Sequence, residues 1–304
     1  MFLARSRSNC KKSEISGILR VGGALNGARK DYRIENHRGV GRAMPMPDAE
    51  FEAQVESLRS RVEPLEKVVH ACAARLPAPL RYHSGKEHHG FRYGKPHAEH
   101  FCLLKAVRAV SAANAAIELA RNGYAQEICV LIRTLVECTT HIEFILCGRD
   151  DAGKLEPAVE KYVQDFFADF ARNDATDFKK AQVRQKMVHE VLGAELDRFA
   201  RQHSPEYEGV SAETYSHTYL TFSNYVHAKY PETMDLYGGR PGHFHLRGMR
   251  GTPKDAENLD IIDTFLTTLS IALAQMISKF RLHDIVEHDP VLAGWFRSTL
   301  SEAG

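Results

Sequence analysis

Two long segments of the chain carry apolar residues at alternating steps of four and three. Steps of this kind return to the same face of an α-helix, so each segment predicts a long helix with one apolar seam. A seam of this length has to be covered by other helices, which predicts a helical bundle. The first seam consists of Phe51, Val55, Leu58, Val62, Leu65, Val69, Cys72 and Leu76, and the second of Leu259, Ile262, Leu266, Leu269, Leu273, Met276 and Phe280.

The segments between these two seams also have helical periodicity. Together with them they predict an all-α protein, an antiparallel helical bundle of about seven to eight helices. Pro64 should kink or divide the first helix, because proline lacks the backbone donor. No run of β-branched residues with a period of two is long enough to predict a sheet. The expected helices cover residues 51–76, 97–122, 124–147, 156–172, 176–202, 212–229 and 254–283, and a short one begins at Pro290.

The first 46 residues differ in charge from the rest of the chain. The formal net charge is +1, yet residues 1–46 carry ten Lys/Arg against three Asp/Glu, which leaves residues 47–304 at −6. The segment has no sustained apolar period and predicts a disordered basic tail ahead of a single domain over 47–304. Either it is a nucleic-acid or targeting arm, or the start is over-extended and Met44 or Met46 is the real beginning.

Cysteine usage and hydropathy bear on the location of the protein. The six cysteines form no C-x-x-C pair and most occupy apolar helical positions, which indicates reduced thiols in a reducing compartment. The most apolar stretch, 128–147, contains Arg133, Glu137, His141 and Glu143, too many polar groups for a lipid-facing span. With no secretory signal visible, we expect a cytoplasmic protein with no membrane association. The acidic body gives no general electrostatic reason to bind nucleic acid.

The helix expected over 124–147 is apolar on all sides, which predicts a central position, yet it carries an ionic stripe. Arg133, Glu137 and His141 follow one another at steps of four and therefore lie in one line. A partly buried charge is costly unless it is paired. The stripe is either a structural ion pair that fixes helix register, or a polar pocket in which Arg133 binds an anion and Glu137 or His141 transfers protons.

The helix expected over 212–229 has a polar side and an aromatic side. The simplest interpretation places the aromatic side in the core and the histidines in water. The alternative is that the polar side lines a cleft against the helix over 124–147. The polar residues are Glu213, His217, Asn224 and His227, and the opposite side carries Tyr215, Tyr219, Phe222 and Val226.

Sixteen histidines raise the question of a metal site. The pairs Glu137/His141 and Glu213/His217 have a spacing of four, so two facing helices could hold a metal with them. Solvated loop histidines are the simpler interpretation, and we predict neither a metal nor a cofactor. The glycine-rich run at 238–242 is expected to be a turn and not an anion-binding loop. Five histidines fall within 18 residues, namely His83, His88, His89, His97 and His100.

Two short motifs resemble a known family. The run Leu131-Ile132-Arg133-Thr134-Leu135-Val136-Glu137, followed by Ser223-Asn224-Tyr225-Val226-His227, is similar to the domain of unknown function 5677 family of bacterial helical proteins. The resemblance covers about residues 97–285 and agrees with an all-helical fold. It implies that Arg133, Glu137, Asn224 and His227 belong to one site. The family brings no assigned reaction.

The chain also resembles, in its general features, the helical HEPN-type ribonucleases, in which an Arg-x4-6-His motif cleaves RNA. In that resemblance the histidine acts in acid/base transfer and the arginine on the phosphate. Arg184/His189 and Arg198/His203 fit the spacing, although chance matches are expected in a chain this rich in Arg and His.

Three functions follow in order of preference. The first is a non-enzymatic interaction or sensor module of a bacterial stress or defence system, with a protein partner or a homodimer formed through exposed helical seams. The second is a metal-independent ribonuclease acting on RNA, with Arg133, Glu137 and His227 as catalytic residues and His141, Asn224 and His217 as binding residues. The third is a metal-dependent bundle hydrolase.

Overall fold

The computed structural model describes residues 45–84, 88–95, 97–168, 189–203 and 210–303. The tail expected over residues 1–46 therefore lies outside the described residues, except for its last two. Arg184 and the first part of the helix expected over 176–202 also lie outside them.

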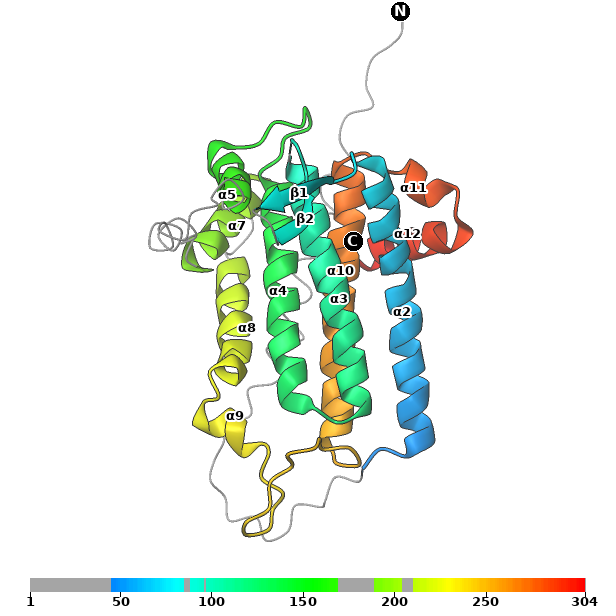
Figure 1. The fold of residues 1–304 in the computed structure, drawn as a ribbon, viewed down its shortest axis with the longest axis vertical. Helices are drawn as coiled ribbons and strands as arrows, with labels where there is room; N and C mark the ends of the chain where they lie inside the picture. The colour runs from blue at the N-terminus through cyan, green and yellow to red at the C-terminus, as the bar shows by residue number, and fades with distance from the viewer. Residues whose placement is uncertain (1–44, 85–87, 96, 169–188, 204–209, 304) are drawn as a thin grey trace, which may run out of the picture.

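Five long helices run along the length of the molecule. Figure 1 shows α8, α4, α3 and α2 side by side, and α10 packs against α2, α3 and α4. The chain runs up through α2, down α3, up α4, down α8 and up α10, so sequence neighbours in the bundle are antiparallel. The predicted all-α antiparallel bundle is confirmed. These helices are α2 (Asp48–Arg75), α3 (Ala98–Arg121), α4 (Ala125–Cys147), α8 (Val210–Val226) and α10 (Lys254–Lys279).

Shorter helices cover the two ends of the bundle. In Figure 1 α5 and α7 lie beside the upper end of α4, α11 and α12 lie near the upper ends of α2 and α10, and α9 follows the lower end of α8. α7 packs against α8 and α4, and α12 packs against α10 and α2. Their bounds are α5 (Pro157–Ala168), α7 (His189–His203), α9 (Tyr230–Met234), α11 (Asp284–Glu287) and α12 (Pro290–Ala303).

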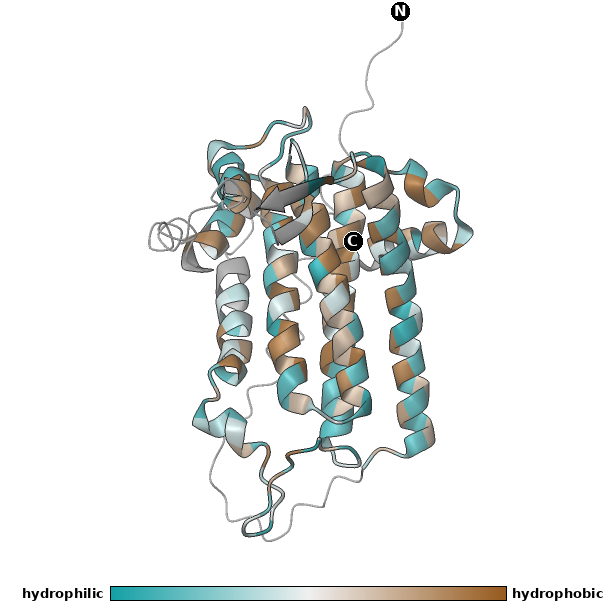
Figure 2. Ribbon diagram, in the orientation of Figure 1, coloured by the Kyte–Doolittle hydropathy of each residue, from teal (hydrophilic) through white to brown (hydrophobic). Residues whose placement is uncertain are grey.

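Both apolar seams are buried within the chain. The seam residues of α2 from Phe51 to Cys72 and those of α10 from Leu259 to Met276 belong to one hydrophobic core. Figure 2 shows this pattern as hydrophobic residues along the helices and hydrophilic residues between them. The packing follows from the single-seam pattern, because each seam is covered by neighbouring helices. The two seams, which we expected to be exposed and to bind a partner, are thus covered by other helices of the same chain.

α10 is the one described helix that is long and apolar enough to cross a membrane. It nevertheless packs against three other helices of the bundle, and its seam residues are buried there. Since a core helix meets the same criteria of length and composition, α10 gives only weak evidence for a membrane span.

The structure corrects the sequence analysis at Pro64 and at the segment after α2. α2 is one helix from Asp48 to Arg75 with Pro64 buried inside it, so of the expected kink or division, the division does not occur. Packing of the long seam offsets the loss of one backbone hydrogen bond. No sheet was predicted, yet β1 (Leu80–Ser84) pairs antiparallel with β2 (His88–Arg92). These five-residue strands contain Arg, His and Gly, so their composition gave no strand signal.

The end of α8 also differs from the prediction. The helix ends at Val226, three residues earlier than expected, and Ala228 has a positive φ of 46°. Pro231 does not simply stop a helix, because it occupies the first turn of the short α9. Proline is tolerated there because a backbone N–H in the first turn has no acceptor within the helix, so its absence costs no hydrogen bond.

Candidate functional site

Arg133 of α4 is the centre of a polar cluster between α4 and α8. Its Nη2 donates a hydrogen bond to the hydroxyl of Tyr219, and its Cζ lies 4.5 Å from the centroid of the Tyr219 ring. Its Nη1 lies 3.4 Å from Oε2 of Glu137, one turn along α4. The Arg133 side chain is 22% exposed and that of Glu137 is 34% exposed. The ion pair is therefore at the edge of the core, in reach of solvent.

Two more tyrosines and a histidine complete this cluster. The rings of Tyr215 and Tyr219 have centroids 6.1 Å apart, and the ring of Tyr162 on α5 lies 5.5 Å from that of His141. Burial raises the pKa of Tyr215, and the nearby Glu137 raises it further. Burial and Glu137 also raise the pKa of Tyr162. We call this group the Arg133 cluster: Arg133, Glu137, His141, Tyr162, Tyr215 and Tyr219.

The cluster follows from helical spacing on two antiparallel helices. Arg133 and Glu137 are four residues apart on α4, and Tyr219 and Tyr215 are four apart on α8. Since residues four apart share a helix face, the two pairs lie opposite each other where α4 and α8 pack. α5 adds Tyr162 from the upper end, where its ring also contacts Phe144.

The chemistry of the Arg133 cluster is that of a recognition site. The tyrosines with raised pKa keep their protons at neutral pH and offer hydroxyl groups as donors or acceptors. Nε of Arg133 is buried and has no hydrogen-bond partner among the described residues. A buried donor of a cation without an acceptor is costly. The cluster could therefore accept one further anionic or hydrogen-bonding oxygen.

The other predicted site residues lie elsewhere on α8. His217 and His227 are exposed, and Asn224 is half-buried. His227 comes after the last residue of α8, eight residues beyond Tyr219, which corresponds to ~12 Å along a helix axis. The structure thus brings Arg133, Glu137 and His141 into one cluster and does not bring His227 to it. The histidines of α8 are in water and Tyr215 and Phe222 are in the core, as the simpler interpretation expects, whereas Tyr219 is half-buried and Val226 is exposed.

The remaining Arg/His and metal candidates add no second site. Among the residues that the structure describes, no group of three or more His, Cys, Asp or Glu could hold a metal ion. Arg198 pairs with Glu156 at 2.6 Å and with Glu195 at 2.7 Å. The side chains of Glu213, His189 and His203 lie outside the described part of the chain, as do those of His83, His88 and His89.

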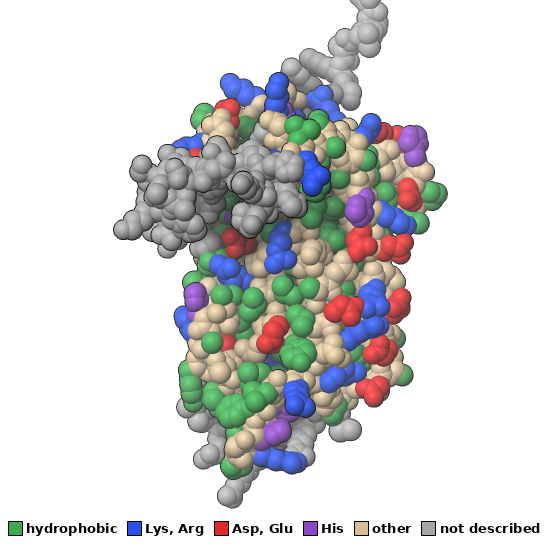
Figure 3. All heavy atoms as spheres, viewed as in Figure 1, with side chains coloured by type: hydrophobic (Ala, Val, Ile, Leu, Met, Phe, Trp, Pro, Cys, Tyr) green, Lys and Arg blue, Asp and Glu red, His purple; other side chains and the backbone are tan. Residues whose placement is uncertain are grey.

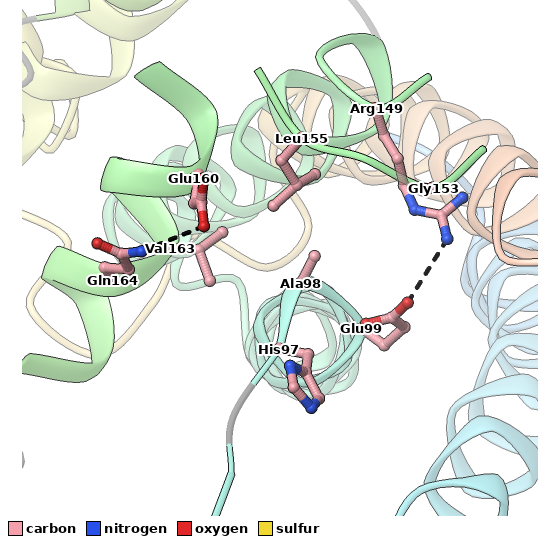
Figure 4. Close-up of a pocket in the computed structure, with 9 residues that line it drawn as sticks. All are labelled: His97, Ala98, Glu99, Arg149, Gly153, Leu155, Glu160, Val163 and Gln164. Carbon is pink, nitrogen blue, oxygen red and sulfur yellow. Dashed lines mark hydrogen bonds and ion pairs between the residues drawn. The ribbon is translucent and has the colours of Figure 1, made fainter. Parts of the chain in front are cut away.

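A cavity of about 490 Å³ lies at the upper end of the bundle. Figure 4 shows Arg149 opposite Glu99, with Gln164 and Glu160 beside each other on α5. Arg149 donates to the carbonyl oxygen of Lys279 at 2.8 Å and lies 3.7 Å from Glu99, so its charge already has partners. The lining therefore has two carboxylates and no spare cation, and it fits an anion less well than the Arg133 cluster does. Its lining residues are His97, Ala98, Glu99, Arg149, Gly153, Leu155, Glu160, Val163 and Gln164.

The sequence analysis missed the role of the tyrosines. It placed Tyr215 and Tyr219 in the core as part of an aromatic side. These tyrosines are four residues apart, as Arg133 and Glu137 are, and this equal spacing is the signal that could have matched the two pairs. No sequence signal connects Tyr162 with α4, because that contact depends on how α5 returns to the bundle. Comparison of the chain with family models, with curated proteins and with solved structures finds no match.

Proposed function

We propose that the protein is a sensor module without catalytic activity, in which the Arg133 cluster recognises one anionic group of a small ligand. The buried Nε of Arg133 without an acceptor is the observation that carries this proposal. A carboxylate or phosphate oxygen would satisfy it and would also compete with Glu137, whose contact with Nη1 is long at 3.4 Å.

Ligand binding at this place would be transmitted through helix packing. The cluster joins side chains from α4, α5 and α8, and Tyr219 of α8 already contacts the guanidinium. An anion bound there would hold the three helices together more firmly, which stabilises the liganded state. The resemblance to the domain of unknown function 5677 family implies one site of Arg133, Glu137, Asn224 and His227. Arg133 and Glu137 pair in the cluster, whereas His227 lies beyond the end of α8. A role in a bacterial stress or defence system, in the cytoplasm, is part of the same proposal.

The enzymatic alternatives have less support. A ribonuclease with Arg133 and His227 requires both at one phosphate, and His227 lies beyond the end of α8. A metal-dependent hydrolase requires at least three ligands together, and none of the described residues form such a group.

The test is thermal unfolding of the full chain with single anions at constant ionic strength. Inorganic phosphate, acetate, succinate and a nucleoside monophosphate are the probes, and chloride is the reference. At ten times the dissociation constant an anion that binds the folded state should raise Tm by about 2–3 °C. Arg133→Gln should abolish this rise and Tyr219→Phe should reduce it.

Arg198→Gln provides a matched control. Arg198 is also paired with glutamates, and its Cζ lies 4.4 Å from the centroid of the Phe199 ring, but it is outside the cluster. The proposal expects Arg198→Gln to keep the full anion response. An equal response in the wild type and Arg133→Gln, with both folded by circular dichroism, would refute the anion site, as would no response to any of the probes.

A further inference from the structure

Large apolar side chains are exposed where α9 and the following loop close the lower end of the bundle. Tyr230 is 78% exposed and Phe244 is 43% exposed, and Tyr237 is exposed beside Phe244 with ring centroids 5.5 Å apart. The loop is held in shape by its backbone, because Gly238 N donates to His243 O at 3.0 Å and His245 N donates to Leu236 O at 2.8 Å. The aromatic rings are thus presented on an ordered turn and not on a loose chain.

Basic side chains accompany these rings. Lys229, Arg240 and Arg247 are exposed, and no carboxylate pairs with them within the part of the chain that the structure describes. Two acidic residues lie on the same segment. Asp235 accepts from the hydroxyl of Tyr225 at 3.3 Å and lies 3.7 Å from Nζ of Lys254, and Oε2 of Glu232 is buried. Three exposed Lys/Arg against these two carboxylates leave residues 229–247 at a formal +1, whereas residues 47–304 as a whole carry −6.

Each exposed ring has one cation close to it in sequence. Lys229 precedes Tyr230 directly, Arg240 follows Tyr237 by three residues, and Arg247 follows Phe244 by three. We call these six residues the aromatic cap. Figure 3 shows hydrophobic, basic and histidine side chains together at this lower end of the molecule.

We propose that the aromatic cap binds single-stranded nucleic acid. A single strand repeats one flat base and one phosphate per nucleotide, and the cap offers rings and cations in the same one-to-one ratio. Bases stack on exposed aromatic rings, and phosphates release counterions when Lys or Arg neutralises them. In a duplex the base faces are already stacked and cannot use the rings. This surface is separate from the Arg133 cluster and does not depend on the sensor function.

The test measures fluorescence anisotropy of labelled 12-nucleotide strands, one of RNA and one of DNA, with the full chain over a series of salt concentrations. A duplex of the same sequence and vesicles containing anionic lipid are the comparison ligands. Arg240→Ala/Arg247→Ala should weaken strand binding by at least about tenfold and make the salt dependence shallower, by roughly 0.7 in the log–log slope for each phosphate that the variant no longer neutralises. Tyr230→Ala and Phe244→Ala should weaken binding about tenfold and leave the slope unchanged.

Two variants at other exposed positions are the controls. Arg297→Ala removes an exposed cation of α12, and Phe91→Ala removes an exposed ring of β2. Both should bind strands as the wild type does, and tighter binding of RNA than DNA would identify RNA as the preferred strand. Strand binding that is unchanged in Arg240→Ala/Arg247→Ala would place the contact elsewhere, for example on the Arg-rich first 46 residues, and would overturn the proposal. Equal or tighter binding of the duplex or vesicles, or self-association through the cap with no strand binding, would also overturn it.

Discussion

Arg133 and Tyr219 are 86 residues apart in sequence, and their contact joins α4 to α8 in two ways. The guanidinium lies over the phenol ring with Cζ 4.5 Å from its centroid, and Nη2 donates to the ring's own hydroxyl. A cation over an aromatic face is stabilised by the ring quadrupole, and the hydrogen bond fixes its orientation. The pair should therefore determine how α8 is placed on α4 as well as hold it there.

A double-mutant cycle measures this contact. Tyr219→Phe removes the acceptor and keeps the ring, so the free energy of unfolding should fall by about 1 kcal/mol. Arg133→Met removes the charge and leaves Glu137 without its partner, which should cost about 1–3 kcal/mol. The double variant should lose less than the sum of the two, by about 0.5–2 kcal/mol in urea unfolding. Additive losses would mean that the two residues stabilise the bundle independently.

Glu143 of α4 should make the stability depend on pH. It is half-buried, and burial of its carboxyl raises its pKa from 4.5 to about 7. The folded protein then holds a proton that the unfolded chain releases between these two values, so stability falls as pH rises from 4.5 through 7. Glu143→Gln removes the charge and with it this pH dependence. The free energy of unfolding of the variant minus that of the wild type should therefore increase by about 2 kcal/mol between pH 5.5 and 8.5.

Urea unfolding at several pH values would measure the effect of Glu143. Glu56→Gln, at an exposed position of α2, is the control and should change stability equally at every pH. A difference between Glu143→Gln and the wild type that does not vary with pH would contradict the prediction.

The loop before α10 closes on the turn between α3 and α4 at Gly248. Gly248 has a φ of 91°, and a Cβ there would lie 1.9 Å from the carbonyl oxygen of Asn122. The next residue, Met249, donates its N–H to the carbonyl oxygen of Gly123 at 2.7 Å. An alanine at Gly248 thus meets both an unfavourable backbone conformation and a fixed backbone atom.

Gly251→Ala separates these two effects. Gly251 has a φ of 75° and open space around its Cβ position, so alanine there should cost about 1 kcal/mol for the backbone conformation alone. Gly248→Ala should cost about 1–3 kcal/mol more, because the turn has to move. The free energy of unfolding of both variants is measured by thermal or urea unfolding. Equal losses would show that the loop before α10 can move away from the turn between α3 and α4 without a cost in stability.

The regular parts of the fold could be predicted because they depend on local periodicity. The seams of α2 and α10 and the helical periodicity between them placed the long helices within a few residues of their observed bounds. β1 and β2 could not be predicted, since their pairing depends on how a short polar segment folds back and not on its composition. The candidate site was half predictable: Arg133 and Glu137 share a line on one helix, but Tyr162 and Tyr215 join them only through the packing of α5 and α8.

A buried ion pair at the lower end of α10 gives the last prediction. The Asp255 side chain is 1% exposed, and its Oδ2 accepts from Nη1 of Arg250 at 2.5 Å and from Gly251 N at 2.8 Å. Arg250 also lies over Phe51 of α2, with Cζ 3.3 Å from the ring centroid, so it joins α2 to α10. Removing the guanidinium of Arg250 leaves the Asp255 carboxylate buried away from water and without its cationic partner.

Arg250→Met should therefore lower the free energy of unfolding by about 3–5 kcal/mol, more than the loss of a surface ion pair. Arg250→Met/Asp255→Asn should recover part of this loss, because an amide has no charge to desolvate and still accepts from Gly251 N. Urea unfolding of the two single variants and the double variant measures the recovery. A double variant less stable than Arg250→Met would mean that Arg250 stabilises the bundle mainly by packing on Phe51, and then a large side chain at position 250 would matter more than its charge.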